Sequence, residues 1–474
     1  MDSLSISLNP NKRLKEEFVS NLTGSSMLEI SALATLVPVL ILLRHSIGSD
    51  RIVDTTTAES KLKKDDNAII GSKSWWDYMA SLLVDFLLIV LPILLFLTVL
   101  AEWMYQAVVF MTLLLLFGVV SKRSSFCSPS VDGGPLSLRT NISSYRVSMM
   151  IVTSLSILAV DFTIFPRRYA KTETFGTGLM DIGVGSFVLA NSLVSRQARN
   201  ISSMKLKTAV QSTSPLIILG FSRLLSTKGV DYQVHVGEYG VHWNFFFTLA
   251  AMSILTSIID VPPQYCGILG SVILVVYQSC LMRGLNTYLL SEERGTDLIS
   301  QNKEGLFSIF GYWGIYLVGV RLGNFLFFQN QASVVRSNKW ARTRVWLLSV
   351  LFWVLTVLIN AHVDRVSRRM CNLAYATMVL AVNLQVLGIL MLSDFIPGSK
   401  TSVLEQACNR NLLATFLLAN VLTGLVNLSM DTLSASPITA LSILIAYAFT
   451  TCVVIGLVDF CGVRLKFGSM SCCI

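Results

Sequence analysis

Asp161 and Lys171 are the residues of this sequence best placed to do chemistry. Asp161 follows a long apolar run, Pro166 then interrupts helical hydrogen bonding, and Lys171 comes ten residues after the acid. Ionisable groups at the edge of a membrane span are costly, so they commonly serve a function. A carboxylate can act as a general base, and an ammonium can stabilise an oxyanion. We therefore expect the two side chains to meet at the mouth of a cavity as a catalytic pair. A purely structural ion pair is the alternative.

Five more polar residues around this turn are candidates for binding a substrate. Arg167 and Arg168 follow the proline at the expected depth of the lipid headgroups, where anchoring to the membrane is the simpler role. Glu173 lies in the same polar segment as Lys171. Asp181 and Asn191 belong to the next apolar run, where hydrogen bonds between helices explain them equally well. All five are kept as candidate contacts to a polar substrate.

No other catalytic or metal-binding pattern stands out in the sequence. The four histidines, His45, His235, His242 and His362, do not have the spacing of metal ligands. No Gly-x-Ser-x-Gly motif occurs in a usable position, and no glycine-rich loop precedes a Lys-Ser or Lys-Thr pair. The nine cysteines are scattered and imply no disulfide framework. We therefore expect neither a metal site nor a bound cofactor.

The elements that position these residues must be membrane-spanning helices. Hydrophobic residues make up 53% of the 474 residues and charged residues 14%, where soluble proteins have about 25%. The mean hydropathy is +0.64. A helix needs roughly 20 apolar residues to cross the hydrocarbon core, and the long unbroken runs are unlike the short alternating segments of a β-barrel. Basic loops that set topology explain the net charge of +9, so it does not indicate a nucleic-acid partner.

About 13 apolar runs predict an all-α, polytopic membrane protein with a single transmembrane domain over residues 1–474. The runs lie near 27–43, 79–100, 104–120, 147–165, 178–195, 208–225, 242–259, 267–282, 305–320, 345–361, 372–393, 411–429 and 437–457. The sixth run contains Arg223, and the eighth is short and flanked by glycine. Either of these two could be tilted, kinked or re-entrant.

The distribution of Lys and Arg predicts which side of the membrane each end of the chain faces. Basic residues are more numerous on the side that holds the segments after the first, third and fifth runs. Cytosolic loops carry such an excess, so we expect a lumenal N-terminus, a cytosolic C-terminus and a lumenal turn between Asp161 and Lys171. The expected segments are a short polar N-terminus at 1–26, cytosolic loops at about 44–78 and 121–146, and a signature segment at 161–195.

The stretch from Asp161 to Val188, DFTIFPRRYAKTETFGTGLMDIGVGSFV, closely resembles the central signature of the GPI-anchor inositol acyltransferases (the PIG-W family). Three further stretches are similar to that family: NKEGLFSIFGY at 302–312, SRRMCNLAY at 367–375 with Asn383, and KEEFVSNLTG at 15–24. The resemblance covers nearly the whole chain. Thr163 departs from it, because many relatives have proline there, but this change affects no charged group.

The resemblance implies an acyltransferase of GPI-anchor assembly in the endoplasmic reticulum membrane. Members of the family move a fatty acyl group from acyl-CoA, a co-substrate, to the inositol 2-hydroxyl of glucosaminyl-phosphatidylinositol. The family's motif acid and lysine correspond to Asp161 and Lys171. By charge complementarity, Arg167 or Arg168 would hold the substrate phosphodiester, and Glu173 would meet the glucosamine ammonium. A multispan lipid transporter or flippase without acyl transfer, and a scaffold subunit, are the rival interpretations of the same pattern.

Overall fold

The protein is an assembly of helices in every part of the chain that the structure describes. The computed structural model describes residues 17–47, 75–125, 135–201, 206–227, 236–328, 338–396 and 401–464. Within these ranges, the β-type pairing consists of isolated bridges that join Gly24 and Ser25 to Thr177. The predicted all-α fold class is therefore confirmed for the described residues.

The helices follow one another with short connections. The first half of the chain forms α2 (Met27–Ile47), α4 (Trp75–Asp85), α5 (Leu91–Phe96), α6 (Met104–Ser125), α7 (Pro135–Ala159), α8 (Ile182–Leu193) and α9 (Leu206–Thr227). The second half forms α10 (Val236–Tyr239), α11 (Phe245–Ile258), α12 (Pro263–Cys280), α13 (Asn286–Leu290), α14 (Leu298–Gln301), α15 (Lys303–Gly323), α16 (Asn338–His362), α17 (Leu373–Leu390), α18 (Val403–Arg410), α19 (Leu412–Ser429) and α20 (Pro437–Phe460). A π-helical turn joins α4 to α5, so the two form one continuous span.

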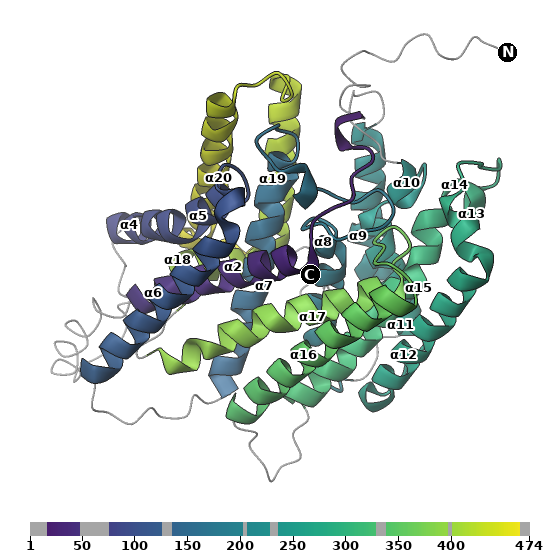
Figure 1. Ribbon diagram of the computed structural model, residues 1–474, viewed down its shortest axis with the longest axis horizontal. Helices are drawn as coiled ribbons and strands as arrows, with labels where there is room; N and C mark the ends of the chain where they lie inside the picture. The colour runs from purple at the N-terminus through teal and green to yellow at the C-terminus, as the bar shows by residue number, and fades with distance from the viewer. Residues whose placement is uncertain are drawn as a thin grey trace.

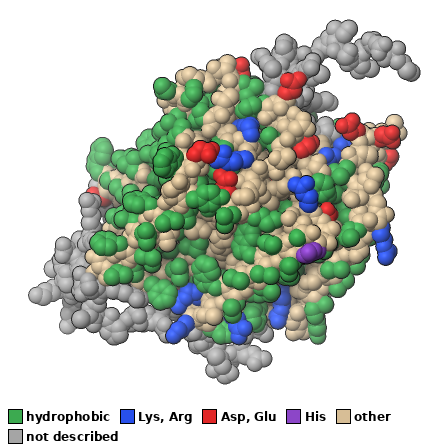
Figure 2. Space-filling model, viewed as in Figure 1, with side chains coloured by type: hydrophobic (Ala, Val, Ile, Leu, Met, Phe, Trp, Pro, Cys, Tyr) green, Lys and Arg blue, Asp and Glu red, His purple; other side chains and the backbone are tan. Residues whose placement is uncertain are grey.

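Ten helical segments of the described residues are long and apolar enough to cross a membrane. Helices α8 and α11 are apolar but have only 12 and 14 residues. Helix α9 has 22 residues with Pro215 inside it and is not one of the ten. The count of about 13 includes all three of these helices and stays a prediction. Figure 2 shows hydrophobic side chains spread over much of the visible face, with several of the basic side chains along its lower edge.

Helix α17 forms the centre of the bundle. Its span is 83% buried, against 17% for the neighbouring span of α16, which faces outward. Helix α17 packs against α2, α7, α8, α15 and α16. In Figure 1, α16 and α17 run side by side, with the α12 and α15 pair beside them, and α4, α5 and α20 lie at the opposite edge. The polar turn that carries the candidate residues therefore lies over a closely packed core.

Two segments differ from the expected boundaries. Residues 48–74, most of the first expected loop, lie outside the described residues. The second expected loop, 121–146, is largely helical, because α6 continues to Ser125 and α7 already begins at Pro135. The polar residues at the start of α7 are buried and bonded: Ser144 donates to Glu405 at 2.6 Å, and Asn141 accepts from Ser393 at 2.9 Å. The start of α7 could not be predicted from apolar runs, because its polar residues are stabilised by contacts with other helices.

The eighth expected span is kinked. Helix α12 continues through a π-helical turn into α13, and within that turn Gly284 has a φ of 116°. Only glycine adopts such a backbone conformation readily. Gly284, which flanks the expected eighth run, is therefore the residue that allows the bend.

Close contacts between helices depend on small residues along α15. A Cβ atom at Gly311 would lie 2.1 Å from the carbonyl oxygen of Cys371, whose φ of 49° is itself in the left-handed region. The same substitution at Gly323 would meet the carbonyl oxygen of Leu193 at 2.3 Å. Helix α15 can therefore approach α8 and the segment before α17 only where it carries glycine.

We expect Gly311→Ala to destabilise the protein by about 1–3 kcal/mol, because the new methyl group meets rigid backbone. The matched control is Gly424→Ala in α19, where a Cβ would have open space around it. That change should be neutral or stabilising by up to about 1 kcal/mol. Thermal unfolding of the detergent-solubilised variants measures both, and equal midpoints for the two would contradict the close approach.

Candidate active site

A cavity of about 810 Å³ opens next to the turn between α7 and α8. It is lined by residues of α2, α7, α8, α9, α10, α17 and α19, together with the turn itself. Three of the seven candidate site residues line it: Asp161, Lys171 and Glu173. Both members of the expected catalytic pair therefore face the same cavity.

Asp161 is held by the way α7 ends. The helix stops at Ala159, and the guanidinium of Arg167 folds back to donate to the carbonyl oxygens of Val160, Phe162 and Phe165, at 2.9, 3.1 and 3.0 Å. These carbonyls at the helix end would otherwise lack intrahelical partners. Asp161 accepts a hydrogen bond of 2.7 Å from the side-chain amide of Asn427 on α19. The position of the carboxylate is thus fixed from two sides.

The two arginines of the turn contact protein groups and not the cavity. Burial lowers the pKa of Arg167 to about 10, and the nearby charge of Asp161 opposes that shift. Arg168 forms ion pairs with Glu29 of α2, at 2.9 Å, and with Glu102, at 2.7 Å. Both side chains therefore fasten the turn to the bundle, where the sequence suggested headgroup anchoring or contact with a phosphodiester.

Lys171 pairs with an acid that the sequence did not single out. Its ammonium contacts both carboxylate oxygens of Glu238 at 2.9 Å, and no ion pair joins it to Asp161 among the described residues. Glu238 also accepts from Arg368 at 3.0 Å, and Arg368 donates through Nε to Asp181 at 2.9 Å. Four charges of alternating sign thus form a row, which we call the ion row: Asp181, Arg368, Glu238 and Lys171.

The ion row is buried at one end and accessible at the other. The side chain of Asp181 is 0% exposed and that of Arg368 is 5% exposed, while Lys171 is 40% exposed. Burial alone would raise the pKa of Glu238, but the charges of Lys171 and Arg368 outweigh it and lower that pKa to about 2. Lys171 therefore faces the cavity while its ammonium is held by the carboxylate of Glu238.

Asp181 and Asn191 have no direct part in the cavity wall. Asp181 accepts from the backbone N–H groups of Gly178, at 2.7 Å, and Thr172, at 3.1 Å, so it closes the loop that carries Lys171. Asn191 lies within α8, 8% exposed, and does not line the large cavity. Glu173 does line the cavity, and its carboxylate lies 4.0 Å from the guanidinium of Arg369.

The segment before α2 covers one side of the cavity mouth. Val19 and Leu22 line the cavity, and the carbonyl oxygen of Leu22 accepts from the backbone N–H of Glu173 at 2.9 Å. Gly176 has a φ of 134°, and a Cβ there would lie 2.0 Å from the carbonyl oxygen of Thr23. Residues that look like a plain polar N-terminus in the sequence are therefore part of the site's framework.

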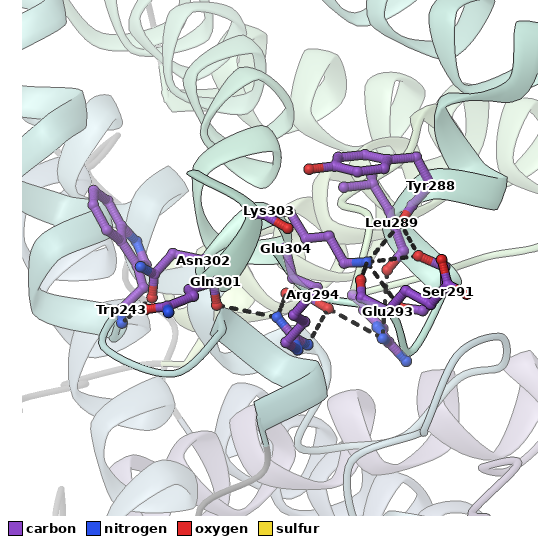
Figure 3. A network of polar contacts seen from close by, with 12 residues as sticks. Trp243, Tyr288, Leu289, Ser291, Glu293, Arg294, Gln301, Asn302, Lys303 and Glu304 are labelled. Carbon is purple, nitrogen blue, oxygen red and sulfur yellow. Dashed lines mark hydrogen bonds and ion pairs between the residues drawn. The ribbon is translucent and has the colours of Figure 1, made fainter. Parts of the chain in front are cut away.

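The stretch at 302–312 contacts residues of another part of the cavity wall, and Figure 3 shows the polar contacts around its first residues. The side-chain oxygen of Asn302 accepts from the backbone N–H groups of His242, at 2.8 Å, and Trp243, at 3.0 Å, and both of these residues line the cavity. Glu304 is buried and accepts from Arg294 at 2.6 Å and from Arg369 at 3.2 Å. This stretch therefore positions wall residues without entering the cavity.

Lys303 fixes the connection beside that wall. Its side chain is fully buried, and its ammonium donates to the carbonyl oxygens of Tyr288, Ser291 and Glu293, at 2.8, 2.7 and 3.1 Å (Figure 3). A buried ammonium is tolerated when its donors are used in this way. The described residues contain no group of three or more His, Cys, Asp or Glu side chains suited to a metal ion.

Comparison with known proteins supports the family resemblance over nearly the whole chain. The model of the GWT1 family matches residues 11–458. An uncharacterized protein of Arabidopsis thaliana is 56% identical over 91% of this chain and 99% of its own length. The GPI-anchored wall transfer protein 1 of Aspergillus oryzae is 37% identical, with 92% and 95% covered. The glucosaminyl-phosphatidylinositol-acyltransferase PIGW of Mus musculus is 32% identical, with 96% and 99% covered. The resemblance expected from the residues around Asp161 is confirmed, and the chain belongs to the GWT1 family.

Proposed function

We propose that this protein transfers a fatty acyl group from acyl-CoA to the inositol 2-hydroxyl of glucosaminyl-phosphatidylinositol, during GPI-anchor assembly in the endoplasmic reticulum membrane. The name of the mouse relative, which shares almost the whole length of the chain, supports this activity and substrate. The observation that carries the proposal is the shared cavity, into which a carboxylate and an ammonium both project from a multispan bundle. Its lining combines a polar mouth with apolar walls, as an amphiphilic substrate requires.

In the proposed mechanism, Asp161 takes the proton of the inositol hydroxyl while the oxygen attacks the thioester carbonyl carbon. The carbonyl oxygen becomes an oxyanion, which the ammonium of Lys171 stabilises. Collapse of the tetrahedral centre breaks the C–S bond, and the departing thiolate of coenzyme A takes up the proton held by Asp161. No acyl-enzyme is required, because the thioester is already activated.

The partners of the two groups make these roles compatible. A lysine in direct contact would lower the pKa of Asp161 and weaken it as a base. In the structure, Glu238 balances the charge of Lys171, and Asp161 is bonded to the neutral amide of Asn427. The base and the oxyanion-stabilising group therefore work in one cavity without neutralising each other.

Charged residues of the cavity also suggest how the polar part of the lipid is held. Arg167 and Arg168 do not line the cavity, whereas Arg223 and Arg368 do. Their positive charges are the better placed to attract the substrate phosphodiester. Glu173 remains the candidate for the glucosamine ammonium, because its carboxylate lies in the cavity wall.

Substitution of the two catalytic candidates tests the mechanism. Asp161→Asn and Lys171→Ala should each reduce acyl transfer by about 10²–10³-fold or more, with protein abundance near normal. Asp431→Asn and Lys339→Ala, at exposed positions that do not line the cavity, are the matched controls and should keep full activity. Purified protein with labelled acyl-CoA and glucosaminyl-phosphatidylinositol measures the rates. Retained activity in either variant removes that residue from the mechanism, and lipid movement without acyl-CoA consumption favours a transporter.

The charge balance at Lys171 predicts how stability depends on pH. The pKa of Glu238 is lowered from about 4.5 to about 2, so its stabilising effect is complete above pH 4.5 and is lost as the pH falls toward 2. We expect Glu238→Gln to lower the midpoint of thermal unfolding at pH 7. The difference in midpoint between the variant and the unchanged protein should become smaller as the pH falls below 4.5. A difference that stays constant from pH 7 to pH 3 would contradict the ion row.

We propose that the mouth of the cavity faces the lumen, as the loop charges predict. Epitope tags at the two ends of the chain, tested in sealed microsomes, examine this orientation. Protease added from outside should remove the C-terminal tag and leave the N-terminal tag intact until detergent is added. Cleavage of the N-terminal tag in sealed vesicles would reverse the orientation.

A further inference from the structure

One face of α7 lines the cavity along almost the whole second half of the helix. Its lining positions recur at spacings of three and four residues, which is the repeat of a single helix face. They are Tyr145, Ser148, Met149, Val152, Thr153, Ser156, Ile157 and Val160, followed by Asp161. The cavity is therefore an elongated channel that runs down α7, away from the catalytic candidates.

The depth of this channel follows from helix geometry. Tyr145 precedes Asp161 by 16 residues, and at about 1.5 Å per residue this corresponds to about 24 Å. Two other helices border the same channel. The lining residues of α17 are Val382, Asn383 and Val386, and those of α19 are Phe416 and Asn420.

A hydrogen-bonded pair closes the deep end of the channel. The hydroxyl of Tyr145 donates to the side-chain oxygen of Asn383 at 2.8 Å, and both residues line the cavity. Their exposed fractions are 1% and 5%. One residue before Tyr145, Ser144 is bonded to Glu405, which also binds His45 at 2.6 Å, so a buried cluster of polar side chains begins next to Tyr145 in the chain. We call Tyr145 and Asn383 the floor of the channel.

The shape and lining of the channel fit a single alkyl chain. Its walls carry apolar groups from four helices, among them Leu33, Val152, Val386 and Phe416. Carbon–carbon bonds of about 1.5 Å that meet at about 111° advance a chain by about 1.25 Å per carbon. After about 4 Å is subtracted for contact with the floor, a length of about 20 Å remains, which holds about 16 carbons.

We propose that the floor formed by Tyr145 and Asn383 sets the upper limit on the length of the acyl chain that the protein transfers. This inference rests on the proposed acyl transfer. The thioester lies at Asp161 and Lys171, and the chain extends along α7 until its terminal methyl group reaches the floor. Chains that are too long hold the thioester away from Asp161, so they are transferred slowly although they are equally reactive.

The length profile of acyl donors tests the floor. Acyl-CoA substrates of 8 to 20 carbons are supplied to the purified protein, and kcat/KM is measured for each. Val152→Phe adds a ring about 10 Å above the floor, which by the same arithmetic leaves room for about 8 carbons, so the ratio of the 8-carbon to the 16-carbon rate should rise about tenfold or more. Tyr145→Ala removes the floor, so the ratio of the 20-carbon to the 16-carbon rate should rise by a similar factor.

The controls separate the floor from general damage. Val350→Phe adds the same ring to an outward position of α16 that is 58% exposed, so the profile should not change. Because Tyr145→Ala removes a buried ring and can impair folding, Val152→Phe tests the channel independently. If both variants transfer acyl chains with an unchanged dependence of kcat/KM on chain length, Tyr145 and Asn383 do not limit the length. The same conclusion follows if only the KM for the acceptor lipid changes. Absence of transfer from every donor by the unchanged protein would instead refute the proposed function.

Discussion

The burial of the ion row is the constraint on which the rest of the site depends. Moving charged groups out of water is costly, and a buried ion is tolerated only when each of its partners is in place. Asp181, Arg368 and Glu238 come from three segments that are distant in sequence, and each segment has its own support. Backbone N–H groups hold Asp181, while Gly311 lets the segment that carries Arg368 approach α15. The loop that presents Lys171 can therefore reach its position only when the whole bundle has formed.

Local sequence patterns predicted most of the helices and drew attention to the turn that lines the cavity, but they did not predict the contacts within it. Long apolar runs correctly indicated most helices, because apolarity over about 20 residues is a local property. The beginning of α7 was not recognised, because Asn141 and Ser144 are polar residues that are satisfied by other helices. Glu238 had no signal, since a single acid in a polar segment is ordinary. Arg223 is an ionisable residue inside an apolar run, which commonly indicates a functional position. Its place in the cavity wall accounts for this charge.

The two ends of the cavity differ in the chemistry that they can accommodate. Charged residues line the mouth, namely Lys171, Glu173, Glu238 and Arg368, and alkyl side chains of α2, α7, α17 and α19 line the deep part. A thioester joins a long apolar chain to a large polar carrier, so its reactive carbon belongs at the boundary between such regions. Asp161 lies at this boundary, because it is the first charged residue after the end of α7 and lines the channel. The end of α7 thus determines where Asp161, the proposed base, lies.

The shortness of α8 affects where the acceptor would meet the protein. With 12 residues, the helix extends about 18 Å, well below the hydrocarbon thickness of about 30 Å. The turn from Asp161 to Asp181 precedes this short helix, and nearly all of its residues are buried or half-buried, so the polar segment is packed into the bundle. A glycolipid that diffuses in the same leaflet could then present its sugar headgroup sideways, with its own acyl tails still dissolved in the membrane. Such an arrangement spares the cost of lifting two fatty tails into water during each turnover.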